Sequence, residues 1–370
     1  MTYSFWPILI AGLCALGFGL LLVGSQNIHG HFTADSTEGI QKVHSHPTPR
    51  IGGLAIFFGL IVAFLLARPE PQSLIGPMLL ASTPALIFGL AEDVTKRVGV
   101  KARFLATMAC GLLAWLITGV ALTSVDVPGF DWLLSFTLVS VVFTAFAAAG
   151  VANAINIVDG FNGLAAGTSS IILVALALIA ANIGDVALAR TCLYVALPVI
   201  GFTCVNWPMG KLFLGDGGAY LIGFSIAWLS ILLIDRRSEV SAFSPLLVCA
   251  YPVTEVLFSI WRRKIRKSSP GAADRLHLHS LVQRRVTPMV VPHGSPLMRN
   301  SVTGALMWIP AGLPATAACF LYSNTPALVS AFLGFVLAYA YVYRRISRFR
   351  VFRILKRPPV PKRPPSSSTP

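Results

Sequence analysis

The sequence predicts an all-α polytopic membrane protein of about eleven transmembrane helices, with its active-site loops on the cytoplasmic side. Composition is the first reason: of 370 residues, 55% are hydrophobic and only 12% are charged. The second is that apolar runs of roughly 17 to 22 residues recur along the chain, each long enough to cross a hydrocarbon core about 30 Å thick. The third is that the basic residues, which give a net charge of +15, gather in alternate loops.

Eleven apolar runs define the predicted spans. They are residues 5–24, 52–67, 74–91, 104–122, 133–150, 163–182, 188–205, 216–234, 243–260, 302–321 and 326–343. The first run has no basic residue before it and no convincing cleavage site, so we expect it to be retained. All six cysteines fall inside these runs, which indicates small hydrophobic residues and not a disulfide framework or a metal site.

The distribution of Lys and Arg predicts an N-terminus outside and a C-terminus inside. With this orientation, the outer loops hold only four basic residues, Arg68, Arg190, Arg236 and Arg237. Residues 1–343 then form an integral membrane domain, and residues 344–370 form a basic cytoplasmic tail, rich in Pro and Ser, that is expected to be disordered. Because topology explains the positive charge, no nucleic-acid partner is expected.

The same orientation places five polar clusters on the cytoplasmic side. The first runs from Pro49 to Gly53 and has His44 shortly before it. The prolines stiffen the start of a helix, and the paired glycines permit close packing or close approach to a ligand. His44 and Arg50 are candidate binders of anionic groups. The alternative is that these basic residues are ordinary interfacial anchors.

The second cluster is the adjacent carboxylates Glu92 and Asp93, followed by Lys96. Neighbouring carboxylates repel each other. At least one of them should therefore bind a metal, pair with a cation such as Lys96, or have a raised pKa suited to proton transfer. An ion pair at the membrane interface would explain them equally well.

The third cluster has Asn153, Asn156 and Asp159 at every third position, followed by glycines and Asn162. On a helix this spacing puts two amides and a carboxylate on one face. An ionisable residue at membrane depth indicates function, and the glycines would let a phosphate approach closely. A polar turn capped by Asn and Asp is the alternative.

The fourth cluster, Lys211 to Gly218, contains Phe213 and Asp216 at the start of an apolar run. A carboxylate in a glycine turn can hold Mg²⁺ while nearby backbone N–H groups hold phosphate oxygens. Phe213 is a candidate for stacking on a base, and Lys211 for binding substrate. A Gly-Asp-Gly sequence is otherwise a common turn.

The fifth cluster lies in the loop before residue 302 and contains Arg275, His277 and His279. Histidines two residues apart point together on an extended segment, so they could ligate a metal or bind a diphosphate. The basic run that precedes them is typical of an orientation signal. Glu255 is a separate intramembrane carboxylate, and the sequence does not indicate its partner.

Together the five clusters resemble, in order, the motifs of the polyprenyl-phosphate N-acetylhexosamine-1-phosphate transferase family, within glycosyltransferase family 4. The resemblance covers roughly residues 40 to 300. The matching segments are Pro49 to Gly53, Glu92-Asp93, Asn153 to Gly160, Phe213 to Gly218, and His277 to Ser280. Four positions depart from the family pattern, which has other residues at Glu92, Asn162, Ala219 and Ser280. The nearest branch makes lipopolysaccharide O-antigen or capsule precursors.

The resemblance implies transfer of a sugar 1-phosphate from a UDP-N-acetylhexosamine, with GlcNAc or a deoxy sugar, to undecaprenyl phosphate with release of UMP. It implies Mg²⁺, or Mn²⁺ in its place, held by Asp216 and Asp159, with catalytic roles for Asp93, Glu92 and Asp159. Substrate binding is expected at His44, Arg50, Lys96, Asn153, Asn156, Asn162, Lys211, Phe213, Arg275, His277 and His279. The expected setting is the bacterial inner membrane, with a homodimer as one expected assembly.

Two alternatives stay open at this point. One is a peptidoglycan phospho-MurNAc-pentapeptide transferase, although that branch carries a fuller histidine motif and a Thr-Pro-Thr segment where this chain has Thr48-Pro49-Arg50. The other is a non-catalytic lipid transporter or flippase, which would also place charges at membrane depth. Transporters put their sites near the midplane and use internal repeats. Here the polar clusters lie at the ends of the predicted spans and no repeat is visible, which favours the enzyme.

Overall fold

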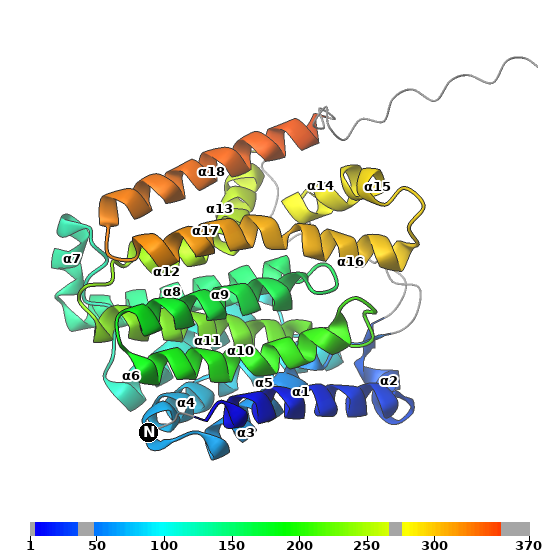
Figure 1. Ribbon diagram of the computed structural model, residues 1–370, viewed down its shortest axis with the longest axis horizontal. Helices are drawn as coiled ribbons and strands as arrows, with labels where there is room; N and C mark the ends of the chain where they lie inside the picture. The colour runs from blue at the N-terminus through cyan, green and yellow to red at the C-terminus, as the bar shows by residue number, and fades with distance from the viewer. Residues whose placement is uncertain (1–3, 36–47, 266–275, 349–370) are drawn as a thin grey trace, which may run out of the picture.

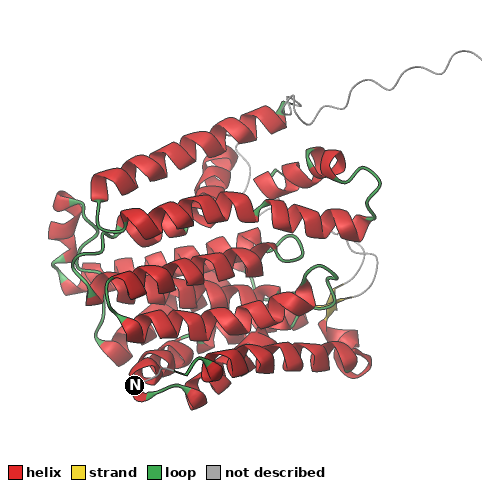
Figure 2. Ribbon diagram, in the orientation of Figure 1, coloured by secondary structure: helices red, strands yellow, loops and turns green. Residues whose placement is uncertain are grey.

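The protein is almost entirely helical. A computed structural model describes residues 4–35, 48–265 and 276–348, and Figure 2 shows helices throughout this part of the chain, apart from one short strand pair. The strands β1 (Ala34–Asp35) and β2 (Thr48–Pro49) pair antiparallel. Most helices lie side by side along one direction (Figure 1), which confirms the predicted all-α polytopic class.

Eight helical segments of the described chain are long and apolar enough to cross a membrane. They are α1 (Trp6–Gly24), α6 (Val100–Thr118), α8 (Thr137–Val158), α9 (Leu164–Asn182), α10 (Val186–Asn206), α11 (Gly215–Arg236), α16 (Pro296–Leu306) continued by α17 (Trp308–Leu321), and α18 (Thr325–Ser347). A ninth crossing forms if α4 (Pro69–Ala81) and α5 (Thr83–Thr95) count as one span bent by 45°. Pro84, in the first turn of α5, has no backbone N–H to continue the hydrogen-bond ladder of α4, which explains the break.

The predicted count of eleven spans is not confirmed in the described residues. The predicted span 52–67 corresponds to α3 (Gly52–Leu66), which is apolar but only 15 residues long. The predicted span 243–260 is divided into α12 (Phe243–Val248) and α13 (Ala250–Ile265). Neither segment has the length and composition of a crossing on its own.

Four short helices join the bundle at its two ends. They are α2 (Gln26–Thr33), α7 (Pro128–Leu134), α14 (Leu278–Arg285) and α15 (Thr287–Val290). In Figure 1, α7 lies at the same end as the N-terminus, whereas α2, α14 and α15 lie at the opposite end. We call these the α7 end and the α14 end. The predicted orientation would put the α14 end in the cytoplasm.

Helix α11 forms the centre of the bundle. Its residues from Gly215 to Leu229 are all buried, and it packs against α3, α5, α6, α8, α9 and α10. Glycines permit this close packing: a Cβ on Gly89 would lie 2.5 Å from the Cα of Gly217, and a Cβ on Gly53 would collide with Gly218. The start of α11 is therefore held directly against α3 and α5, near the first two polar clusters.

We expect Gly89→Ala to destabilise the protein, because its methyl group would have to push apart the backbones of α5 and α11. Overpacking of this kind costs about 1 to 3 kcal/mol. Gly150→Ala in α8 is a matched control, since a Cβ there meets no atom within 4 Å. Thermal unfolding in detergent should show a lower Tm for Gly89→Ala only. Equal Tm values for the two variants would contradict the close packing.

Two of the arginines that depart from the positive-inside pattern are neutralised at the α7 end. The buried carboxylate of Asp185, in the turn before α10, accepts hydrogen bonds from Arg236 Nε at 2.7 Å and Nη2 at 3.1 Å, and Arg237 Nε lies 3.9 Å away. The same carboxylate caps α10 by accepting from Leu188 N–H at 3.0 Å. Burial alone would raise the pKa of Asp185, but these hydrogen bonds and charges outweigh burial and lower it.

We expect Asp185→Asn to lower the free energy of unfolding by roughly 1 to 3 kcal/mol, because an arginine loses its charged partner. Since the pKa of Asp185 is lowered in the folded protein, its stabilising effect is complete at neutral pH and disappears as the pH falls through that pKa. Unfolding should therefore separate the variant from the wild type at pH 7.5 and less so at acid pH. A difference that is independent of pH would contradict the ion pair.

Candidate active site

Four of the polar clusters meet at the start of α11. The chain around Phe213 runs beside the first cluster: Phe213 N–H donates to the Pro49 carbonyl at 2.8 Å, and Gly52 N–H donates to the Phe213 carbonyl at 2.9 Å. Gly53 N–H donates to the Leu214 carbonyl at 3.0 Å. Gly215 follows with φ of +74°, a conformation that favours glycine. These contacts bring the first and fourth clusters together.

Asp93 caps α11 from the end of α5. Its side chain is buried, and its two carboxylate oxygens accept hydrogen bonds from the backbone N–H groups of Asp216 and Gly217, each at 3.0 Å. A negative charge at a helix N-terminus is favourable. The sequence predicts that backbone N–H groups of the glycine turn hold phosphate oxygens. That expectation is wrong for these two, because Asp93 already accepts from both.

Asp216 is the centre of a charged network. Its buried carboxylate forms an ion pair with Arg103 of α6, and Arg50 Nη2 lies 3.4 Å from its Oδ1. Asn156 donates to the same oxygen at 3.1 Å, and Tyr220 donates to Asn156 at 3.3 Å. Side chains from three other segments, α6, α8 and the chain before α3, thus contact one carboxylate.

Arg50 links this network to Asp93, whose Oδ1 lies 3.5 Å from Arg50 Nε. The sequence alone does not single out Arg103, because a basic residue at the end of a span looks like an anchor. Its contact with Asp216 joins residues 113 positions apart. The site therefore holds two arginines facing two buried carboxylates.

Asp159 lies immediately after the last turn of α8. Among the described residues, no hydrogen bond or ion pair involves its half-buried carboxylate. Burial raises the pKa of Asp159 to about 7, while the positive charge of Arg50 lowers it and the charge of Asp93 raises it. Asp159 therefore lies within electrostatic range of both residues.

The donor atoms at this site fit a magnesium ion. Mg²⁺ is usually held by one or two carboxylates, with substrate phosphates and water completing its shell. Asp159 provides a carboxylate without a partner in the described structure, and Asp216 provides a second one that would exchange a contact with Arg103 or Arg50. Within residues 4–35, 48–265 and 276–348, no group of three or more His, Cys, Asp or Glu side chains could hold a metal ion. The fit thus depends on substrate oxygens.

The fifth cluster packs on the third. His277 and His279 stack with ring centroids 5.1 Å apart and an interplanar angle of 7°. His279 also forms a T-shaped pair with Phe161, with ring centroids 5.7 Å apart, and its Nε2 lies next to Gly160, the residue after Asp159. The two histidines thus reach the loop that follows α8.

The comparisons with known proteins agree with the motifs. A family model described as Glycosyl transferase family 4 matches residues 75–234. The undecaprenyl-phosphate alpha-N-acetylglucosaminyl 1-phosphate transferase of Salmonella typhi is 30% identical over 251 residues, which are 66% of this chain and 67% of that protein. The chain belongs to glycosyl transferase family 4. The resemblance inferred from the sequence motifs is thereby confirmed.

Two further relatives carry similar names. A probable undecaprenyl-phosphate N-acetylglucosaminyl 1-phosphate transferase of Bacillus subtilis (strain 168) is 30% identical over 242 residues, 65% of this chain and 66% of that protein. The Yersinia pestis undecaprenyl-phosphate alpha-N-acetylglucosaminyl 1-phosphate transferase is 29% identical over 251 residues, 66% of this chain and 68% of that protein. The alignments thus span about two thirds of each relative.

In this glycosyl transferase family 4 protein, the predicted site residues Glu92, Lys96 and Asn153 each have their own hydrogen-bond partners. Glu92, in the last turns of α5, is half-buried and accepts from Val98 N–H at 2.8 Å, which ties the helix to the loop that follows it. Lys96 Nζ donates to the Asp93 carbonyl at 2.7 Å. Asn153 donates to Thr107 of α6 at 3.3 Å. Their roles in catalysis and substrate binding stay predictions.

Asn162 is buried and faces α16, where its backbone N–H donates to Asn300 at 2.7 Å and its amide donates to Ser301 at 3.3 Å. These bonds hold the loop before α9 and give Asn162 a structural use that its sequence position did not suggest. Lys211 is exposed and Phe213 is half-buried. His44 and Arg275 lie outside the described residues.

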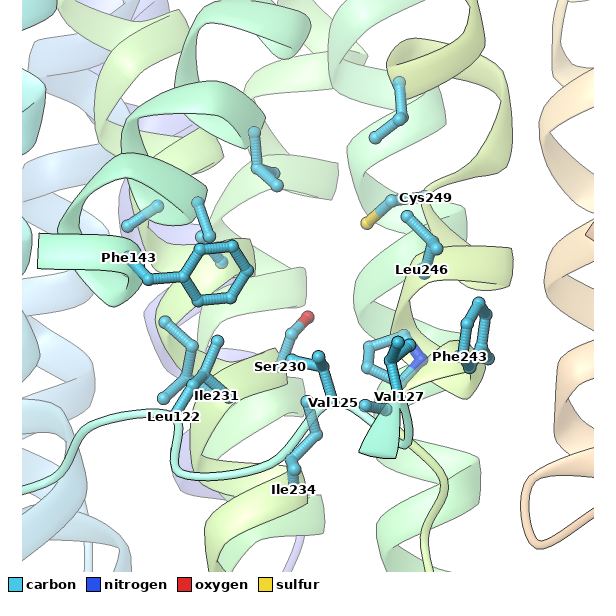
Figure 3. Close-up of a pocket in the computed structure, with 17 residues that line it drawn as sticks. Leu122, Val125, Val127, Phe143, Ser230, Ile231, Ile234, Phe243, Leu246 and Cys249 are labelled. Carbon is cyan, nitrogen blue, oxygen red and sulfur yellow. The ribbon is translucent and has the colours of Figure 1, made fainter. Parts of the chain in front are cut away.

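The protein also contains an apolar pocket, shown in close-up in Figure 3. It lies toward the α7 end, because Val125 and Val127, just before α7, line it. It has a volume of about 300 Å³ and lies between α8, α11, α12 and the segment before α7. Phe143, Ile231 and Phe243 are among its walls, and Ser230 is one of its few polar residues. Since Ser230 is fourteen residues after Asp216 on α11, the pocket lies roughly 20 Å along the helix from the charged site.

Proposed function

We propose that this protein transfers N-acetylglucosamine 1-phosphate from UDP-N-acetylglucosamine to undecaprenyl phosphate, giving undecaprenyl-diphosphate-N-acetylglucosamine and UMP. The observation that carries the proposal is the charged network at the start of α11, where Arg50 and Arg103 face Asp93 and Asp216. This network is built from the motif residues of a family whose matched relatives are named for that reaction. The product would begin a cell-surface polysaccharide such as the O-antigen of lipopolysaccharide.

The reaction exchanges one diphosphate (P–O–P) bond for another. An oxygen of the lipid phosphate attacks the β-phosphorus of the UDP-sugar, the bond from that phosphorus to the bridging oxygen breaks, and UMP leaves with the electron pair. Both substrates are anionic, so their approach needs positive charge. Arg50 and Arg103 supply it beside the buried carboxylates. We favour this direct attack over a covalent aspartyl intermediate.

The carboxylates divide the remaining tasks. Asp159 and Asp216 would hold Mg²⁺, which supplies charge neutralisation for the diphosphate when it is bound. Asp93 keeps the start of α11 in place through its two backbone hydrogen bonds and sets the charge beside Arg50. From that position it acts on the lipid phosphate as a base or by orienting it. His277 and His279 bind anionic substrate groups.

The apolar pocket supports a lipid acceptor. Its walls are almost entirely hydrocarbon, and its position roughly 20 Å from Asp216 suits a distal part of a polyprenyl chain whose phosphate lies at the charged site. In this arrangement the polyprenyl chain of the lipid lies along α11, from the α14 end toward the α7 end. The alternative of a transporter requires no such separation between a polar site and an apolar pocket.

A substrate assay tests the function. Purified protein should consume UDP-N-acetylglucosamine only when undecaprenyl phosphate is present, whereas a transporter or flippase would leave the nucleotide sugar intact. UDP-MurNAc-pentapeptide is the comparison donor, because it would be preferred by a peptidoglycan enzyme. The relatives named for N-acetylglucosaminyl transfer favour the first donor. Turnover of the second donor alone would contradict the proposal.

We also propose that the site faces the cytoplasm of the bacterial inner membrane, where UDP-sugars are made. The positive-inside distribution supports this orientation. Cysteines introduced at Ser280, at the α14 end, and at exposed Ser238, at the α7 end, can be labelled in a background in which the accessible cysteines, Cys14, Cys204 and Cys319, are replaced by serine. An impermeant thiol reagent added to intact spheroplasts should react at position 238 and not at 280. The reverse pattern would place the site on the wrong side of the membrane for its donor.

A further inference from the structure

Glu255 of α13 is a buried carboxylate with a defined partner. Its side chain is 1% exposed, and its Oε1 accepts from His277 Nδ1 and from Leu278 N–H, each at 3.0 Å. Its Oε2 is buried and has no hydrogen-bond partner in the described part of the chain. A buried charge of this kind is costly unless it is paired, so the contact with His277 accounts for its presence.

The contact fixes the state of the His277 ring. An ionised carboxylate can only accept hydrogen bonds, so the proton shared with Glu255 belongs to Nδ1 of the imidazole. His277 is also the residue directly before α14, and Glu255 accepts from the first N–H of that helix. The orientation of the ring and the start of α14 are therefore set by the same oxygen.

Ring contacts connect the orientation of His277 to the candidate active site. The His277 ring lies flat on His279, and His279 in turn meets Phe161 in the loop after Asp159. A second contact from α13 holds the same segment, because Arg262 Nη1 donates to the Leu276 carbonyl at 2.6 Å. Helix α13 thus forms hydrogen bonds with the residues on both sides of His277, Leu276 and Leu278.

We propose that Glu255 is a positioning residue for donor binding, which acts by holding His277, and through it His279, against the loop that follows α8. This inference rests on the proposed function. Glu255 itself lies behind the histidine and is not expected to touch substrate. Its removal should therefore impair the enzyme only as far as His277 depends on it, and it should affect the nucleotide sugar more than the lipid acceptor.

A double-mutant cycle tests the dependence. Glu255→Gln keeps the shape and removes the charge, and outer partners of functional histidines contribute roughly 10- to 100-fold. We expect Glu255→Gln and His277→Gln each to raise the KM for UDP-N-acetylglucosamine by about 10-fold or more, with the KM for undecaprenyl phosphate unchanged. The double variant should be no worse than His277→Gln alone, because the proposed effect of Glu255 on the donor site passes through His277.

Asp185→Asn is the matched control, since Asp185 is also a buried, ion-paired carboxylate but lies at the α7 end. It should lower the Tm without changing the KM for the donor, both in the wild type and in the His277→Gln background. If Glu255→Gln does not give folded protein, Glu255→Asp takes its place in the cycle. In that variant the carboxylate is kept but shortened by one methylene.

The outcomes separate the two claims. If the KM of the double variant rises by the product of the two single-variant increases, Glu255 and His277 act independently and the positioning role is overturned. A Glu255 variant with a wild-type KM would overturn it as well. Neither result would count against the transferase activity. Wild-type protein that turns over no UDP-sugar with undecaprenyl phosphate would instead overturn the proposed function. A Glu255 variant with a lower Tm and an unchanged KM for the donor, as expected for Asp185→Asn, would also count against positioning.

Discussion

Asp216→Asn should reduce turnover by about 10²-fold or more while the protein still folds. The asparagine keeps the shape of the side chain but removes the charge that faces Arg103 and Arg50. It also weakens the site as a ligand for Mg²⁺, which prefers charged oxygen donors. Asp159→Asn should act similarly if it shares the ion, since Asp159 provides the unpaired carboxylate of the site.

The dependence on metal separates this effect from loss of structure. Initial rates should be measured across a Mg²⁺ titration, alongside the Tm of each variant. Asp131→Asn is a suitable control, because Asp131 accepts from Ser124 and Val125 in the loop at the α7 end, far from the charged site. Asp216→Asn with near wild-type activity at limiting Mg²⁺ would exclude Asp216 as the metal ligand.

Asp93→Asn should nearly abolish transfer, whereas Glu92→Gln should cost less and Glu92→Asp least of all. Asp93 is buried, receives two N–H groups at the start of α11 and lies beside Arg50. An asparagine offers only one accepting oxygen, so one of those N–H groups loses its partner and the charge beside Arg50 disappears. The expected loss for a positioned acid–base group is roughly 10²- to 10⁴-fold.

Glu92 has a different environment although it is the next residue. Its carboxylate accepts from Val98 N–H in the loop that follows α5, and a glutamine can still accept that bond. All three variants should be compared at saturating UDP-sugar and Mg²⁺. If Glu92→Gln proves more damaging while Asp93→Asn stays active, then Glu92 is the residue that meets the lipid phosphate, and the roles are reversed.

Local spacing made part of the site predictable. Asn156 and Asp159 are three residues apart at the end of one helix, so a helical pattern alone places them on one face. The structure shows Asn156 in contact with Asp216 and Asp159 within electrostatic range of Arg50. The membrane class followed from composition and the length of apolar runs, which depend on no tertiary contact.

Other features depend on packing between distant segments. Arg103 looks like any basic residue at the end of a span until α6 brings it to Asp216, and the partner of Glu255 lies beyond the end of α13. Substrate binding by Asn162 stays a prediction from its place in a motif, whereas its packing against α16 could not be inferred from the sequence. The predicted number of spans also differs from the structure, because the helix breaks near Pro84 in one predicted span and at Cys249 in another.

The identity of the nucleotide product tests the central claim most directly. Transfer of a sugar 1-phosphate cleaves the UDP diphosphate, so purified protein given UDP-N-acetylglucosamine and undecaprenyl phosphate should release UMP. The lipid should gain the mass of N-acetylglucosamine plus one phosphate. Release of UDP, with a lipid that gains only the sugar, would show that the glycosidic bond breaks instead, and would contradict phosphoryl transfer at Asp216.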